Sequence, residues 1–176
     1  MSSTSPEGTA LGLSRTVLSI LLRLNPLAGL FIAVLLLTSL VAPEFLMRAL
    51  GMEREIGRAA YASGMRFVMV AGIVAVVVTQ LVFTRLYAIV QTVREGDPFI
   101  VDNAQRLQQI AWCVLAGELI HLVIVMVAAW MSSTATPIDI RWKMSITPWL
   151  VVALLFVLAR VFETGARMRE DLEGTI

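Results

Sequence analysis

The sequence is poor in the residues that most catalytic and metal centres use. It has one cysteine, Cys113, and one histidine, His121, in 176 residues. A single cysteine excludes an intramolecular disulfide and a multi-cysteine metal cluster, and its place in an apolar run suits a packed side chain. The sequence also has no phosphate-binding glycine loop, no zinc-ligand spacing and no nucleophile beside a base. We therefore expect no enzymatic activity, no bound metal and no cofactor.

Charged residues are also scarce, and their signs nearly cancel. They make up 15% of the chain, and 14 Lys and Arg against 13 Asp and Glu give a net charge of +1. Direct binding to nucleic acid is not expected, because no strong positive field attracts it. In contrast, 58% of the residues are hydrophobic and the mean hydropathy is +0.82, more than soluble domains carry. We expect the chain to lie in a lipid bilayer.

Four apolar runs are long enough, or nearly so, to cross a bilayer as helices, which takes about 20 residues each. The shortest has 16 uncharged residues between Lys143 and Arg160, but the Arg160 head group can extend to the interface. The runs are too long and too uniform for barrel strands. We expect an all-α integral membrane protein, an antiparallel bundle of four transmembrane helices. The predicted spans are 24–43, 66–90, 107–131 and 146–163, in one domain over 17–176 after a disordered polar leader, 1–16.

An even number of spans places both termini on one side of the membrane. The leader, the middle connection and the tail together carry eight arginines, and the other two connections carry six basic residues. This bias favours a cytoplasmic location for both termini and the middle connection. The eight are Arg15, Arg23, Arg85, Arg94, Arg106, Arg160, Arg167 and Arg169, and the six are Arg48, Arg54, Arg58, Arg66, Arg141 and Lys143.

The middle connection, "VREGDPFIVDN", holds a helix-stop signal followed at once by a helix-start signal. Gly96 can adopt the left-handed conformation that closes a helix, Asp97 can accept amide hydrogen bonds as an N-cap, and Pro98 suits the first helical position. Alternatively, Asn103 caps the third span and leaves 98–102 as a short step at the interface. Both alternatives place the apolar side chain of Phe99 at the membrane surface.

The tail, residues 164–176, continues the fourth span as an amphipathic helix. One helix over 146–173 would be about 42 Å long, more than the roughly 30 Å hydrocarbon core requires, so its end should extend into the cytoplasm. Its apolar stripe could fold back onto Phe99 and Ile100 and cap the bundle, or it could form a docking surface for another protein. The stripe comprises Val161, Gly165, Met168, Leu172 and Ile176.

Three polar side chains fall deep inside the predicted spans: Gln80, Glu118 and His121. Glu118 lies about 16 Å along its helix from Leu107, near mid-bilayer, and His121 lies on roughly the same face. We expect a Gln80–Glu118 hydrogen bond that joins two helices, and a proton or cation relay through Glu118 and His121 is the alternative. Glu-x-x-His is also half of a di-iron motif, but the remaining ligands are missing, so no metal is expected.

Two patches carry a resemblance to a known family. "EGDPFIVDNAQRL" and "FETGARMREDLEGTI" resemble domain-of-unknown-function family 2975, small bacterial membrane proteins of four predicted helices. The resemblance implies a bacterial inner-membrane location and, more loosely, a small helix-turn-helix regulator as partner. The family pattern matches Gly96, Pro98, Phe99, Asn103 and Leu107 in the first patch, and Phe162, Gly165, Met168, Asp171 and Thr175 in the second.

These observations favour a non-enzymatic interaction or regulatory protein that acts through the hairpin (Gly96, Asp97, Pro98, Phe99 and Asn103) and the tail. The alternative is a small oligomeric transporter or ion-coupled protein that uses Glu118 and His121. The expected partners are the lipid bilayer together with either a cytoplasmic protein or further copies of the chain.

Overall fold

A computed structural model describes residues 6–49, 58–135 and 145–173. These residues form five helices, and four of them are long and apolar enough to cross a membrane. The prediction of an all-α chain with four membrane spans is therefore confirmed. The helices are α1 (Pro6–Val41), α2 (Pro43–Ala49), α3 (Arg58–Arg94), α4 (Val101–Ala135) and α5 (Thr147–Glu173). The candidate spans are Gly12–Val41, Ala62–Arg94, Val101–Val127 and Thr147–Leu172.

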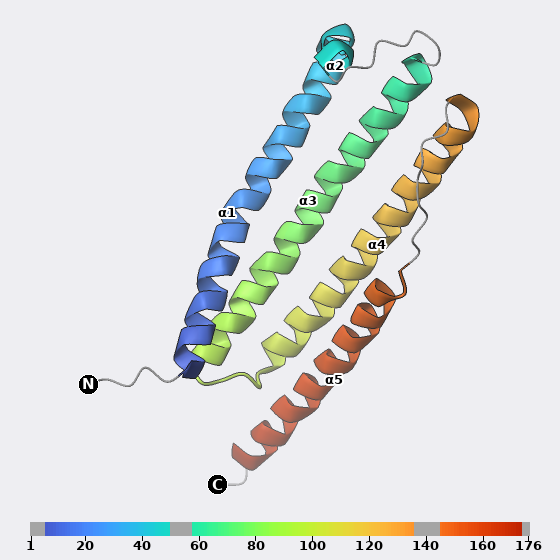
Figure 1. The fold of residues 1–176 in the computed structure, drawn as a ribbon. Coiled ribbons are helices and arrows are strands. Elements are labelled where there is room, and N and C mark those ends of the chain that lie inside the picture. Colours follow the sequence, from blue (N-terminus) through green and yellow to red (C-terminus); the bar gives the residue numbers. More distant parts are fainter. Residues whose placement is uncertain (1–5, 50–57, 136–144, 174–176) are drawn as a thin grey trace.

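The four long helices pack antiparallel in the order in which they follow one another in the chain (Figure 1). α1 packs against α3, α3 against α4, and α4 against α5. Among the described helices, no comparable packing joins α1 to α4 or α5. The expected antiparallel bundle is thus an open row of helices, and most of its apolar side chains face outward, as lipid-facing residues do.

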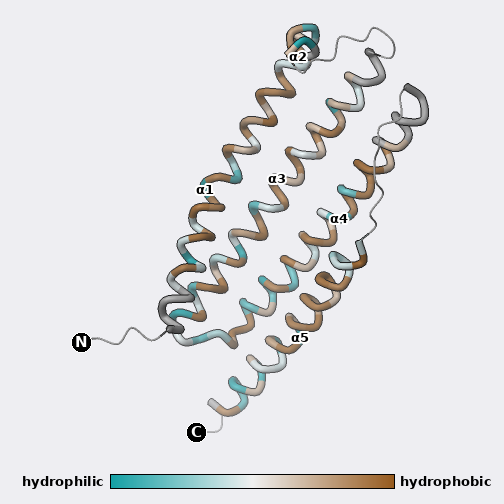
Figure 2. Tube along the Cα trace, in the orientation of Figure 1, coloured by the Kyte–Doolittle hydropathy of each residue, from teal (hydrophilic) through white to brown (hydrophobic). Residues whose placement is uncertain are grey.

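One end of the row holds the start of α1, the α3–α4 connection and the end of α5 (Figure 1). We call it the hairpin end, and the end that carries α2 the opposite end. Apolar residues run along all four helices, and hydrophilic residues recur toward the hairpin end of α4 and α5 (Figure 2). The start of α1 at Pro6 and the end of α5 at Glu173 therefore lie on one side of the predicted bilayer, as an even number of spans requires.

The contact between α1 and α3 depends on small residues. A Cβ atom added at Gly29 would lie 2.9 Å from Cγ1 of Val76, so the two helices approach closely at this point. A Cβ added at Gly72 would lie 3.5 Å from Cδ1 of Ile32, an ordinary contact. Small residues bring transmembrane helices together because packing, rather than the hydrophobic effect, holds them in lipid.

A proline inside α1 leaves a backbone carbonyl without its helical hydrogen bond, and a side chain of α3 donates to it. Pro26 has no N–H group, so the carbonyl of Leu22 lacks its usual hydrogen bond from the residue four positions later. Nε2 of Gln80 donates to this carbonyl at 3.3 Å. Nδ2 of Asn25 donates to Oε1 of Gln80 and to the carbonyl of Val76, each at 2.9 Å. Side chains of α1 and α3 thus supply polar contacts where the bilayer offers no water.

The same arrangement recurs near the opposite end. Pro43 cannot donate to the carbonyl of Ser39, and Nη2 of Arg66 donates to it at 2.6 Å. Nε of Arg66 also donates to Oγ of Ser39, at 3.1 Å. Ser39 is only 1% exposed. Arg66 therefore fixes the end of α1 against the start of α3.

α5 is displaced toward the hairpin end relative to α4. Trp112 and Phe156 contact each other edge to face, with ring centroids 5.3 Å apart. Because both helices rise equally per residue, the start of α5 at Thr147 is level with His121 of α4. Figure 1 accordingly shows α5 beginning partway along α4. α5 has 27 residues, a length of about 40 Å, and it agrees closely with the predicted helix over 146–173.

The beginning of the chain differs from its prediction. Residues 1–16 were expected to be a disordered leader, but α1 begins at Pro6. Proline suits the first turn of a helix, because its missing N–H would have no helical partner there. Nε of Arg15 donates to the hydroxyl of Tyr87 at 3.1 Å, which holds this first part of α1 against α3. Residues 1–5 lie outside the described residues.

Candidate functional site

The turn that ends α3 is a Schellman motif centred on Gly96. This residue has a φ of 86°, and its N–H donates to the carbonyl of Val93 at 3.2 Å. The N–H of Asp97 donates to the carbonyl of Thr92 at 3.0 Å. These two bonds satisfy carbonyls that a helix end leaves open. The predicted conformation of Gly96 is confirmed.

α4 begins at Val101, which corrects both predicted starts. Pro98 lies before the helix, in an irregular step that includes Phe99, and Asn103 lies inside the helix rather than at its N-cap. The reason is that both candidate capping side chains have other partners. The carboxylate of Asp97 pairs with Arg169 of α5, and the side chain of Asn103 binds α3 and the connection.

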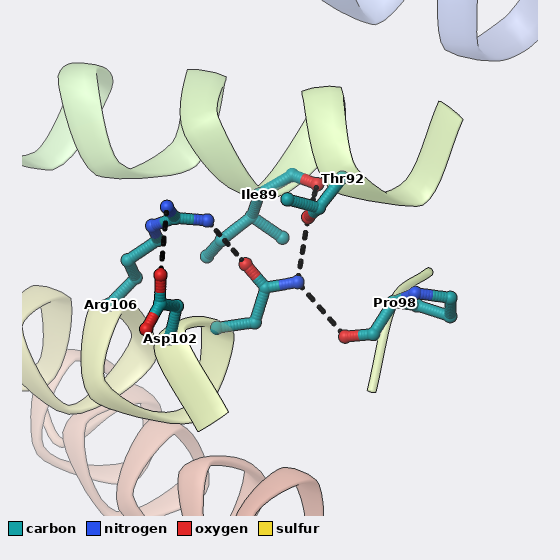
Figure 3. A network of polar contacts seen from close by, with 6 residues as sticks. Ile89, Thr92, Pro98, Asp102 and Arg106 are labelled. Carbon is teal, nitrogen blue, oxygen red and sulfur yellow. Dashed lines mark hydrogen bonds and ion pairs between the residues drawn. The ribbon is translucent and has the colours of Figure 1, made fainter. Parts of the chain in front are cut away.

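Asn103 is the central residue of the hairpin, and it is fully buried at 0% exposure. Its Nδ2 donates to Oγ1 of Thr92 at 2.7 Å and to the carbonyl of Pro98 at 2.9 Å. Its Oδ1 accepts from Nη1 of Arg106 at 2.8 Å. Arg106 also lies 3.7 Å from the carboxylate of Asp102 (Figure 3). One amide thus joins the last turn of α3, the connection and the first turns of α4.

The tail packs onto this hairpin through two kinds of contact. The ring of Phe99 lies on that of Phe162, with centroids 5.1 Å apart and planes inclined by 37°. Phe99 also covers Gly165, where an added Cβ would lie 3.0 Å from Cδ1 of the ring. Farther along α5, Arg169 forms an ion pair with Asp97. We call residues 94–102 and 160–172 together the hairpin–tail platform.

The predicted apolar stripe of the tail is divided between two environments. Gly165 faces Phe99, as the first alternative, packing of the stripe onto the hairpin, requires. Val161, Met168 and Leu172 are instead 55%, 59% and 71% exposed, and Ala166 is buried at 5%. The packed face of α5 is therefore rotated from the predicted stripe, toward Phe162 and Ala166. Thr175 and Ile176 of the tail prediction lie outside the described residues, and Asp171 lies on the exposed surface.

The intramembrane polar residues form two separate pairs. Nδ1 of His121 lies 3.8 Å from Oε1 of Glu118, and their side chains are 60% and 17% exposed. Gln80 does not complete this pair as predicted, because its amide is engaged with Asn25 and with the carbonyl of Leu22 on α1. The physical reason is the backbone acceptor that Pro26 leaves open, which a bilayer cannot satisfy.

Several polar partners were missing from the sequence-based site. Asn25 stands beside Pro26 near the start of the first apolar run, so an unexplained polar residue was a visible signal there. Thr92 and Arg106, by contrast, became recognisable only through their bonds to Asn103. Among the described residues, no group of three or more His, Cys, Asp or Glu side chains is placed to hold a metal ion.

Comparison with known proteins identifies a family. The model of a family described as "Protein of unknown function (DUF2975)" matches residues 1–176. No curated protein and no solved structure shows significant similarity to the chain.

Proposed function

We propose that this chain, which belongs to the DUF2975 family of proteins of unknown function, is a non-enzymatic membrane protein that holds a cytoplasmic protein partner at its hairpin end. The observation that carries the proposal is the packing of the tail onto the hairpin. Phe99 lies against Phe162 and Gly165, and Asp97 pairs with Arg169. A surface whose parts are fixed before binding loses less conformational entropy when a partner binds.

The proposed orientation places the hairpin end in the cytoplasm of a bacterial cell. The eight arginines near this end outnumber the six basic residues of the other two connections. Positively charged residues accumulate on the cytoplasmic side of inner-membrane proteins. A cytoplasmic partner would therefore meet the hairpin–tail platform and not α2.

Met168 and Leu172 are the residues we propose as the centre of the contact. They are 59% and 71% exposed, and they lie among charged residues beyond Arg160, the first charge after the fourth apolar run. Exposed apolar side chains within a polar rim are typical of protein-binding surfaces. The family resemblance makes a small helix-turn-helix regulator the first partner to test.

The test compares one double variant and one control in native membranes. Met168→Ser with Leu172→Ser changes the exposed contact without touching Phe99 or Asp97. Phe45→Ser is the matched control, because Phe45 is a 66% exposed apolar residue on α2 at the opposite end. Proteins that co-purify with the full chain are identified by mass spectrometry, and binding of the purified candidate to the purified chain is then measured.

We expect the purified partner to bind the full chain and the Phe45→Ser variant, and to bind the double variant at least tenfold more weakly. A change of this size corresponds to about 1.4 kcal/mol, which loss of two apolar contacts can supply. Equal binding to the double variant would contradict the proposed surface. A partner that depends on Phe45 instead would place the interaction at the opposite end.

A specific observation supports an alternative function as an ion-coupled protein. Nδ1 of His121 and Oε1 of Glu118 lie 3.8 Å apart inside a candidate membrane span, so a small rearrangement of either side chain would bring them into hydrogen-bonding distance. Ionisable residues at such depth often serve ion or proton transfer. If this function holds, a pH-dependent transport activity of reconstituted protein should vanish in Glu118→Gln and persist in Met168→Ser with Leu172→Ser.

A further inference from the structure

A groove of about 250 Å³ lies between α4 and α5 near the hairpin end. It shares Val101, Arg160 and Glu163 with the hairpin–tail platform, but Phe99, Asp97, Met168 and Leu172 are not among its lining residues. One wall belongs to α4 and the other to α5, and each wall has polar and apolar members. The lining residues are Val101, Ala104, Gln105, Gln108, Phe156, Ala159, Arg160 and Glu163.

The polar part of the groove is built around Glu163. Its Oε2 accepts from Nη1 of Arg160 at 2.7 Å, and its Oε1 accepts from Nη2 of Arg167 at 2.6 Å. Among the lining residues the charges of Arg160 and Glu163 cancel, and Arg167, which borders the groove through its bond to Glu163, adds a net positive charge. The arginine side chains are 77% and 68% exposed, against 31% for Glu163. A guanidinium has five N–H donors, so its bond to Glu163 leaves donors for an anion such as a phosphate.

The apolar part of the groove consists of Phe156 and Ala159 on α5 and of Ala104 and Val101 on α4. Ala104 and Ala159 are 6% and 7% exposed, so their small side chains bring the two helices together at the floor of the groove. The ring of Phe156 rests against Trp112, which continues the apolar surface along α4. Such a wall suits a hydrocarbon chain and offers little to a small hydrated anion.

The groove lies where the apolar part of the helices meets their charged part. Arg160 is the first charged residue after the uncharged stretch that follows Lys143. On α4, Arg106 is the last charged residue before the uncharged stretch that leads to Glu118. Basic pockets between transmembrane helices at this depth suit the head groups of anionic lipids.

We propose that this groove binds an anionic phospholipid. Arg160 and Arg167 contact the phosphate, Gln105 and Gln108 donate further hydrogen bonds to the head group, and an acyl chain lies along Phe156 and Ala159. Glu163 holds the two guanidinium groups in place and prevents strong binding of anions that lack an apolar part. This lipid site goes beyond the proposed protein-binding function and does not depend on it.

The test uses the full chain, purified in detergent and freed of lipid, and native mass spectrometry. The probes are phosphatidylglycerol, phosphatidylcholine with the same acyl chains, and inorganic phosphate. We expect phosphatidylglycerol to remain bound in preference to phosphatidylcholine. Arg160→Gln with Arg167→Gln should weaken phosphatidylglycerol binding at least tenfold. Arg48→Gln is the matched control, because Arg48 is also exposed and paired with a glutamate, Glu44, but lies at the opposite end.

A second variant tests the groove without removing its charge. Gln108 is exposed, so Gln108→Trp should fold, fill the groove and reduce phosphatidylglycerol binding while both arginines remain. Unchanged binding in either groove variant would overturn the proposal. Displacement of phosphatidylglycerol by inorganic phosphate would also overturn it and indicate a simple anion site. Met168→Ser with Leu172→Ser should keep the lipid, so failure of the lipid site and failure of the protein-binding surface are distinguishable.

Discussion

Single polar side chains decide how the first two membrane spans fit together. The carbonyls of Leu22 and Ser39 receive no helical hydrogen bond, because the residue four positions later is a proline in each case. In each case a side chain of α3 donates to that carbonyl, Gln80 in the first and Arg66 in the second. Because lipid offers no alternative partner, these two contacts fix both the depth and the rotation of α3 against α1.

This arrangement predicts an energetic coupling between Gln80 and Pro26. Gln80→Leu should destabilise the protein by about 1–2 kcal/mol, because it removes hydrogen bonds to Leu22 and Asn25. In a Pro26→Ala background the helix itself can donate to the Leu22 carbonyl, so the loss should be about 1 kcal/mol smaller. Unfolding of the four combinations in mixed micelles measures this difference.

The control for this coupling is a distant buried residue. Asn103→Leu removes three side-chain hydrogen bonds at the hairpin, far along the helices from Pro26. Its cost should be the same with and without Pro26→Ala, because distant sites contribute independently. Equal losses for Gln80→Leu in both backgrounds would show that Gln80 does not act through the proline.

At the scale of elements, the contact between the hairpin and α5 depends on a glycine. A Cβ atom added at Gly165 would lie 3.0 Å from Cδ1 of Phe99, so even a small side chain there requires the ring to shift. The buried alanines Ala159 and Ala166 lie on the adjoining face of α5. The fourth helix can therefore approach the hairpin closely, and its tail is positioned by packing as well as by the Asp97–Arg169 ion pair.

Gly165→Leu should separate the tail from the hairpin. The larger side chain must displace Phe99, and overpacking of this kind costs about 1–3 kcal/mol. In a Cys113→Ala background, Asp97→Cys with Arg169→Cys provides two thiols that a short bis-maleimide can join. We expect the yield of the cross-link to fall several-fold when Gly165→Leu is added.

Gly117→Leu is the matched control for this experiment. Gly117 is another glycine in a long helix, but an added Cβ there meets nothing within 4 Å. The cross-link yield should therefore stay unchanged. A yield that also stays unchanged with Gly165→Leu would show that the contact with Phe99 does not position the tail.

At the scale of the whole molecule, the helices form a row and not a closed bundle. α1 and α5 are the outer members, and each of them packs along its length on one long neighbour. The start of α1, the hairpin and the end of α5 share one end of the row (Figure 1). Because the four helices alternate in direction, the proposed orientation applies to the molecule as a whole and can be tested at any connection.

This topology predicts the location of reporter domains in a bacterial inner membrane. Alkaline phosphatase, which is active only outside the cytoplasm, should be inactive when fused after Glu173 or after Glu95. It should be active when fused after Ala49, at the end of α2. Enzyme activity in whole cells, with blotting to confirm equal expression, measures each location. Activity at all three positions, or the reverse pattern, would contradict the proposed orientation.

Much of the architecture was determined by the sequence alone, because a bilayer imposes simple physical requirements. Four long apolar runs must be helices, since lipid cannot satisfy an open backbone. The position of Gly96 predicted where α3 ends. The length of the helix predicted after Lys143 exceeds the hydrocarbon core, which predicted that α5 continues past Arg160. These features depend on local composition, which can be read along the chain.

Only the tertiary structure decided which side chains meet. Gln80 was expected to bond Glu118 but bonds Asn25 and Leu22, because the acceptor left open by Pro26 lies across the α1–α3 contact. Asn103 was one of two candidate helix caps but is buried among groups from three segments. Helix rotation and depth set these pairings, and small residues such as Gly165 determine both through close packing, which hydropathy does not reveal.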